Sequence, residues 1–160
     1  MVPKIIWLIP LLMTSCSLNF SGPLTGPLLL NAQIRPNVAN EVFVAITNAS
    51  LKRHLRSDFL KSSDELYSTL DLIEGYIGGS LRVEPFGNQA WTLTIWKDKE
   101  AMNRFVLGQA HMAAAFTHGE AIIKFRSADF IMESQLIPNV WDKAMEKLDE
   151  IPKESIPQYY

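Results

Sequence analysis

The chain has 160 residues, of which 48% are hydrophobic and 20% are charged, a composition typical of one domain with one core. Its formal net charge of −2 excludes the strongly basic surface that nucleic-acid binding usually needs, so we expect no nucleic-acid partner. A single cysteine, Cys16, excludes an internal disulfide.

The first 16 residues have the pattern of an export signal. Lys4 gives a positive start, residues 5–12 are mostly apolar, and small residues precede Cys16. The apolar run is too short to cross a bilayer, which takes about 20 residues. The segment resembles a bacterial lipoprotein signal peptide, which implies a lipid anchor on Cys16 at the cell envelope. By the same resemblance, Ser17 after the cysteine, rather than Asp, implies the outer membrane of a Gram-negative cell. The alternative is an ordinary secretory signal and a secreted or periplasmic protein.

Residues 17–40 are predicted to form a Pro/Gly-rich tether, because Gly-Pro occurs at residues 22–23 and again at 26–27. Prolines and glycines at this density prevent regular elements. The apolar patch at residues 28–30 either docks on the domain or lies near the membrane. The folded domain is predicted at residues 41–150, and prolines mark residues 151–160 as a tail.

The first half of the domain is predicted to be strand, helix and strand. Residues 42–48 carry apolar side chains on both alternating faces, which indicates a strand covered on both sides. A polar, basic loop at residues 50–57 precedes a helix. This helix is predicted from residue 57 or 58, or about a turn later, to residue 72. A second strand follows at residues 76–84, where Gly78-Gly79 indicates a bulge or a close approach by another backbone.

Residues 89–116 are the most informative stretch. A turn sequence at residues 85–88 leads into a third strand at 89–96, so the second and third strands are predicted to form a hairpin. Along the third strand Trp91, Leu93 and Ile95 alternate with Ala90, Thr92, Thr94 and Trp96. Asp98 is placed to cap a helix that ends at Gly108, and a second helical run begins at Gln109.

The rest of the domain is predicted to be a strand and a short helix. Residues 121–125 continue or end the second helical run, and residues 126–134 form a fourth strand. A last helix begins near Pro138. Its predicted apolar side consists of Val140, Trp141, Ala144, Met145 and Leu148.

The predicted order is strand, helix, strand, strand, helix, strand. This is an α+β fold of the ferredoxin-like βαββαβ type, a four-stranded antiparallel sheet with helices on one face. The first and third strands carry large apolar groups on both faces, so the second sheet face must also be buried. Because the domain has only enough helix for one face, we predict a homodimer in which two sheets pair as a dimeric α/β barrel.

A sequence resemblance to a known superfamily lies in the same informative stretch. Thr-Leu-Thr-Ile-Trp-Lys-Asp-Lys-Glu-Ala-Met at residues 92–102, followed by Phe105 and Ala110-His111, resembles the dimeric α/β-barrel, antibiotic biosynthesis monooxygenase-like superfamily. The closer local match is to spheroidene monooxygenase, and residues 136–144 give a weaker second match. The resemblance implies a cleft between sheet and helices for a hydrophobic small molecule. Some members need no cofactor, and others bind haem through a histidine.

The resemblance also implies a set of site residues. His111 is the candidate catalytic residue, as a base or, if haem is bound, as the iron ligand; an unperturbed pKa near 6.5 suits either role. The residues implied to wall the pocket are Trp91, Trp96, Phe105, Met112 and Phe116. Trp91 and Trp96 lie on opposite strand faces, so at most one of them lines any single pocket. The plainer interpretation of His111 is a histidine hydrogen-bonded to the chain at a helix N-terminus.

Two functional hypotheses follow. The first is an oxygenase-like enzyme acting on a hydrophobic small molecule, with haem or without a cofactor. The second is a non-catalytic envelope lipoprotein that uses the same dimeric barrel to bind a ligand or a partner. His118 lies about 10.5 Å further along the helix than His111, so the two cannot share one metal ion. The sequence carries no hydrolase or nucleotide-binding motif.

Overall fold

The computed structural model describes residues 20–36 and 38–152. The segment with the predicted signal and Cys16, and most of the predicted tail, lie outside the described residues. Within the described part of the chain, no helix is long and apolar enough to cross a membrane.

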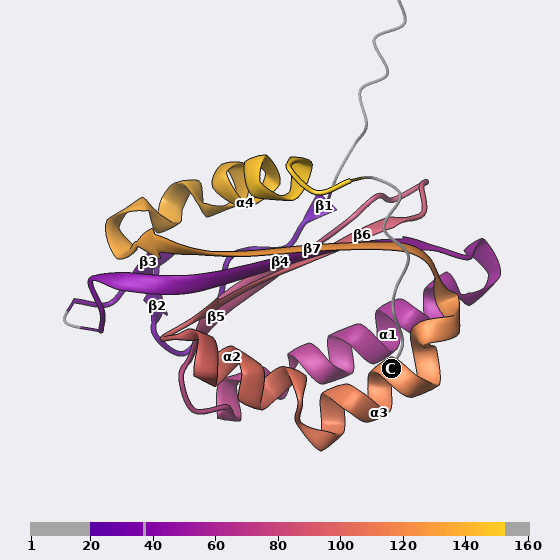
Figure 1. The fold of residues 1–160 in the computed structure, drawn as a ribbon, viewed down its shortest axis with the longest axis horizontal. Helices are drawn as coiled ribbons and strands as arrows, with labels where there is room; N and C mark the ends of the chain where they lie inside the picture. Colours follow the sequence, from indigo (N-terminus) through magenta and orange to yellow (C-terminus); the bar gives the residue numbers. More distant parts are fainter. Residues whose placement is uncertain (1–19, 37, 153–160) are drawn as a thin grey trace, which may run out of the picture.

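Four long antiparallel strands form the sheet (Figure 1). They are β4 (Glu41–Leu51), β5 (Tyr76–Val83), β6 (Gln89–Trp96) and β7 (Ile122–Glu133), in the spatial order β5-β6-β4-β7. Helix α1 (Arg56–Tyr67) connects β4 to β5, and helices α2 (Lys99–Val106) and α3 (Gln109–His118) connect β6 to β7. This order confirms the predicted ferredoxin-like βαββαβ fold.

Short elements fill the connections. The 3-10 turns are η1 (Arg53–Leu55), η2 (Leu70–Leu72), η3 (Gly119–Ala121) and η4 (Ser134–Asn139), and the last helix is α4 (Val140–Asp149). Before the domain lie three two-residue strands, β1 (Phe20–Ser21), β2 (Leu29–Leu30) and β3 (Gln33–Ile34). Strand β1 pairs with β5 and so adds a fifth strand to the sheet.

Some predicted boundaries are confirmed and others are wrong. The helix predicted to reach residue 72 ends at Tyr67, and the first strand continues to Leu51, into the predicted loop. Asp98 caps α2 as predicted, because its Oδ1 accepts a hydrogen bond from the Ala101 amide at 2.8 Å. Residues 122–125, predicted as part of the second helical run, instead belong to β7, whose register continues to Leu51↔Ile122. Ile and Phe are enriched in strands, and pairing with the long β4 satisfies this backbone.

Both predicted features of Gly78-Gly79 are present. The pairing of β5 with β6 shifts register between Tyr76 and Gly78. A Cβ on Gly78 would lie 2.3 Å from Leu29 Cδ1 and 2.7 Å from the Thr25 carbonyl oxygen. The close neighbour is therefore the segment that precedes the domain.

That preceding segment, expected as a tether, lies on the sheet over its described part. The Thr25 amide donates to the Gly79 carbonyl at 3.0 Å, and the Gly79 amide donates to Thr25 at 2.7 Å. Leu29 is only 8% exposed and belongs to the main core, which places the apolar patch on the domain. Of the two alternatives for residues 28–30, docking on the domain or lying near the membrane, the structure shows docking on the domain.

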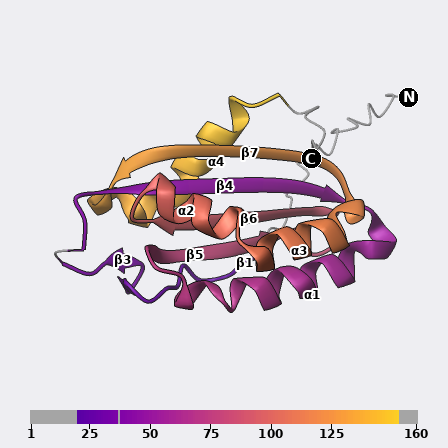
Figure 2. The ribbon, with the colours of Figure 1, turned by 60° about the horizontal axis from the view of Figure 1, so that its bottom comes forward.

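Helices cover both faces of the sheet (Figures 1 and 2). α1, α2 and α3 lie on one face, as predicted, and α4 lies on the other. Val140, Ala144 and Leu148 on α4 are buried against the strands, which confirms most of the predicted apolar side. The homodimer rests on the premise that one chain leaves this face open, and α4 contradicts that premise. The structure of one chain does not test the homodimer itself.

Candidate functional site

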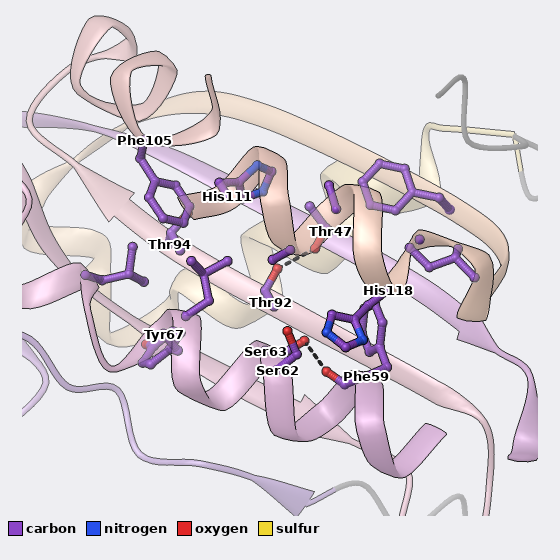
Figure 3. Close-up of a pocket in the computed structure, with 17 residues that line it drawn as sticks. Thr47, Phe59, Ser62, Ser63, Tyr67, Thr92, Thr94, Phe105, His111 and His118 are labelled. Atoms are coloured by element: carbon purple, nitrogen blue, oxygen red, sulfur yellow. Dashed lines mark hydrogen bonds between the residues drawn. The ribbon is translucent and has the colours of Figure 1, made fainter. Parts of the chain in front are cut away.

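A cavity of about 340 Å³ lies between the sheet and helices α1 and α3 (Figure 3). The sheet contributes its floor, α1 one wall and α3 the opposite wall. Its lining residues are Thr47, Phe59, Ser62, Ser63, Leu66, Tyr67, Leu70, Thr92, Thr94, Phe105, His111, Ala114, Ala115, His118, Gly119, Ile122 and Phe125. This lining contains no aspartate, glutamate, lysine or arginine. The cavity is therefore suited to an uncharged, mainly apolar molecule.

Three threonines form a polar strip on the floor. Thr47 on β4 and Thr92 on β6 are directly opposite each other in the antiparallel register. Their side-chain oxygens are hydrogen-bonded (Figure 3), and Thr94 lies one pleat further along β6. Threonine favours strands because its branched Cβ packs well on a pleated surface. Hydroxyl groups at these positions give the floor hydrogen-bonding capacity within an otherwise apolar face.

His111 lies at the junction of the cavity with α2. Helix α3 begins after its N-cap Gly108, and the third helical residue, His111, turns inward. The imidazole lies against the backbone of Val106, and its buried Nδ1 makes no hydrogen bond of good geometry with the described residues. Burial lowers the pKa of His111, and the backbone of Val106 opposes this shift. The imidazole is therefore mainly neutral at pH 7.

Tyr67 supplies a second unsatisfied polar group. It is the last residue of α1, and its buried hydroxyl has no hydrogen-bond partner of good geometry in residues 20–36 and 38–152. Burial raises the pKa of Tyr67 to about 12, while the neighbouring Tyr76 acts in the opposite direction. The phenol stays protonated at neutral pH and can donate a hydrogen bond to an oxygen of a bound molecule.

Of the six predicted catalytic and ligand-binding residues, two line the cavity, two are buried tryptophans outside its lining, and two are exposed on α3. Phe105 and His111 line the cavity together, with ring centroids 5.0 Å apart in an edge-to-face contact. Trp96 lies behind Phe105, stacked on it at 5.5 Å. Trp91 packs in the core on the opposite sheet face, as the strand alternation predicts.

Met112 and Phe116 lie outside the cavity lining and are 50% and 93% exposed. The inner face of α3 is formed by His111, Ala114, Ala115 and His118 at the spacing i, i+3, i+4 and i+7, which leaves Met112 and Phe116 on its outer side. Cys16 lies outside the described residues.

The sequence reasoning did not select Tyr67, Thr47 or Thr92 as site residues. The alternation of β6 already places Thr92 and Thr94 on the same face as Trp96. A polar strip on the helix-covered face of a strand was the available signal. No signal marks Tyr67, because its position depends on where α1 ends.

The cavity does not fit haem. His111 offers the cavity an imidazole. The haem carboxylates, however, would meet a lining without a cation, and burying an unpaired carboxylate is costly. Among the described residues, no cluster of three or more His, Cys, Asp or Glu could hold a metal ion.

Comparisons with known proteins support the fold. No protein-family model matches the chain, and no curated protein matches it significantly. Rv0793 from Mycobacterium tuberculosis is 12% identical, with a TM-score of 0.50 over 57% of this chain and 92% of its own. A Shewanella oneidensis protein is 13% identical, with a TM-score of 0.53 over 59% and 93%.

A proposed antibiotic biosynthesis monooxygenase from Nitrosomonas europaea is 11% identical to this chain. The match has a TM-score of 0.51 over 57% of this chain and 88% of that chain. At such identities the likeness shows the fold alone. The chain therefore shares the ferredoxin-like α+β fold of these structures.

Proposed function

We propose that this protein is monooxygenase-like and binds a small, uncharged hydrophobic ligand in the cavity between the sheet and helices α1 and α3. The observation that carries the proposal is the lining of this cavity, which has no charged carboxylate, ammonium or guanidinium group and is mainly apolar. A charged ligand would lose its hydration there without gaining a charged partner, whereas an apolar one gains by leaving water.

His111 is the proposed base. A lowered pKa keeps its imidazole unprotonated near pH 7, and a general base must be unprotonated to accept a proton. The Tyr67 hydroxyl, protonated because of its raised pKa, donates to an oxygen of the ligand. The base removes a proton from a C–H bond of the ligand, and the electron pair left on carbon passes to dioxygen. In the balanced reaction a CH2 group becomes C=O: one oxygen atom stays on the carbon, the other leaves as water with the two hydrogens, and the ligand itself supplies all four electrons.

The alternative is a binding protein of the cell envelope. It is favoured by the apolar run and Cys16 in the first 16 residues, which resemble a lipoprotein signal and imply a lipid anchor. Because an exported oxygenase has no cytoplasmic reductant, the bound molecule itself would have to supply the electrons. The same cavity serves binding alone without that requirement.

Two probes of similar shape test the proposed site. 2-Naphthol is uncharged at pH 7, whereas 2-naphthoate carries a carboxylate, and tryptophan fluorescence reports binding of either. We expect 2-naphthol to bind at least about tenfold more tightly, a difference of about 1.4 kcal/mol, because the lining has no lysine or arginine to pair with a carboxylate. Equal affinities, or no binding of either probe, would contradict the uncharged cavity.

Oxygen uptake in the presence of a panel of electron-rich aromatic compounds then separates the enzyme from the binding protein. His111→Ala should abolish uptake. Met112→Ala, one position on but outside the lining, should leave it unchanged. Binding of 2-naphthol without uptake for any compound would favour the envelope binding protein.

A further inference from the structure

The sheet face opposite the cavity is large and apolar. Val44 and Ile46 of β4 and Leu93 and Ile95 of β6 have no exposed surface, and Val42 has 1%. These side chains belong to one core cluster with residues of β5, β7 and α4. Soluble monomers rarely leave a contiguous apolar patch of more than a few hundred Å² open to water. A cover on this face is therefore a physical requirement of the fold.

The cover comes from the same chain. α4 places Val140, Ala144 and Leu148 on the face, each at most 1% exposed. Leu29 from the preceding segment joins the same cluster, with Leu24, Leu28 and Ile34 packed around it. In Figures 1 and 2, α4 lies on the side of the sheet opposite helices α1, α2 and α3.

Arg126 on β7 fastens the C-terminal end of α4. Its side chain is 12% exposed, and its Nη1 donates to the carbonyls of Leu148 at 3.2 Å and Ile151 at 3.5 Å. Its Nη2 donates to Asn48 Oδ1 at 3.4 Å, which ties the guanidinium to β4. A cation at the last turn of a helix also interacts favourably with the helix dipole.

The N-terminal end of α4 has a separate contact. The guanidinium of Arg82 on β5 lies 4.1 Å from the ring centroid of Trp141, a cation–π geometry. The preceding segment is fastened by Gly22, whose amide donates to the Leu81 carbonyl at 2.8 Å. Both pieces of the cover are thus held by polar contacts as well as by apolar packing.

The lengths of the matched structures agree with this division. The matches cover at most 59% of this chain in the structures described, which is about 94 of 160 residues, yet they span 88–93% of those chains. The segment from Glu41 to Glu133, which runs from β4 through β7, has 93 residues. The stretch from β4 through β7 is therefore about as long as the matched part of the chain, and α4 and residues 20–36 lie outside that stretch.

We propose that α4 and residues 20–36 act as an intramolecular partner that occupies the sheet face on which a second copy would otherwise pack, so that the protein is a monomer. Covering the face within one chain avoids the loss of translational freedom that association of two chains costs. The cavity on the other face is complete in the single chain, since all its lining residues come from one copy.

The mass of the full chain in solution tests this directly. Sedimentation equilibrium in a density-matched nonionic detergent, which keeps the apolar N-terminal run in solution, should give the mass of one chain, 18.1 kDa, over a wide concentration range. A mass of two chains overturns the proposal.

Two variants, each with a new lysine on α4, test whether this helix covers the sheet face. Ala144→Lys puts a charge into the covered interface, whereas Glu146→Lys puts it on the exposed side of the same helix. We expect Ala144→Lys to displace α4, and so to self-associate or to bind a hydrophobic dye several-fold more than wild type. Glu146→Lys should behave as wild type. A monomeric Ala144→Lys chain with unchanged dye binding would show that α4 does not cover the face.

Discussion

The edge of the Phe105 ring meets the ring of His111 at a centroid distance of 5.0 Å, and Phe105 is itself stacked on Trp96 at 5.5 Å. This contact joins α2 to α3 at the cavity wall and shields one side of the imidazole from water. The desolvation that lowers the pKa of His111 therefore depends on a side chain from a different helix.

Replacing Phe105 should relax that shift. In Phe105→Ala, water reaches the imidazole, so we expect the pKa of His111 to rise toward its ordinary value near 6.5. Loss of the partly buried ring should also lower the unfolding free energy by about 2 kcal/mol, less than the loss of a fully buried phenylalanine. NMR titration and urea unfolding measure the two effects. Phe116→Ala, at a 93% exposed position, is the control and should change neither; an unchanged pKa in Phe105→Ala would contradict this role.

The buried imidazole should make stability depend on pH. Because the pKa of His111 is lower in the folded chain, the unfolded chain takes up the proton first as the pH falls. The stabilisation is complete above about pH 6.5 and is lost as the pH decreases toward the folded-state pKa. Urea unfolding across this range should show a smaller loss of stability in His111→Gln than in wild type. Identical pH profiles would mean that the ring is not desolvated.

The hydrogen bond between Thr47 and Thr92 should be measurable by a double-mutant cycle. Thr92→Val removes one hydroxyl and leaves the other without its partner, which we expect to cost about 1 kcal/mol. Once Thr47→Val is present, the second change should cost less, because no orphaned hydroxyl remains. Thermal unfolding of the four proteins gives the coupling energy. Strict additivity would show that the two hydroxyls do not stabilise each other.

The α2 cap should contribute a modest, local stabilisation. Asp98→Ala removes the acceptor of the 2.8 Å bond from the Ala101 amide, a loss of about 1 kcal/mol for a typical N-cap. Asp98→Asn keeps an oxygen acceptor and should retain most of the stability. Chemical denaturation compares the two variants, and equal losses would assign the effect to charge rather than to the hydrogen bond.

Haemin should not form a specific complex at His111. The lining has no cation for the haem carboxylates, so we expect the same visible spectrum from wild type and His111→Ala when haemin is added. A Soret shift present in wild type and absent in His111→Ala would restore the haem-binding hypothesis and contradict our assessment of the cavity.

Much of the fold follows from local sequence patterns. The alternation along residues 89–96 predicts β6 and the opposite orientations of Trp91 and Trp96, and Asp98 marks the start of α2. Gly78-Gly79 indicates a close neighbour, which the structure supplies as Leu29. These features are readable because each depends on side chains only a few residues apart.

The site was less readable from the sequence. Resemblance led to His111 and Phe105, and both line the cavity, yet it also led to Met112 and Phe116, which α3 turns toward solvent. Adjacent helical residues differ by about 100° in direction, so which of them faces a cavity depends on how the helix is rotated against its neighbours. Tyr67 and Thr47 become site residues only because α1 and β4 meet α3 there.

By itself, the sequence determined which side chains share a face of each element and the order in which the elements follow. Only the tertiary structure decided what lies against those faces. The covered sheet face is the clearest case, because the alternation of β4 and β6 demands a cover but does not name it. Apolar burial is non-directional, so α4 and a second copy satisfy the same pattern, and their arrangement in space distinguishes them.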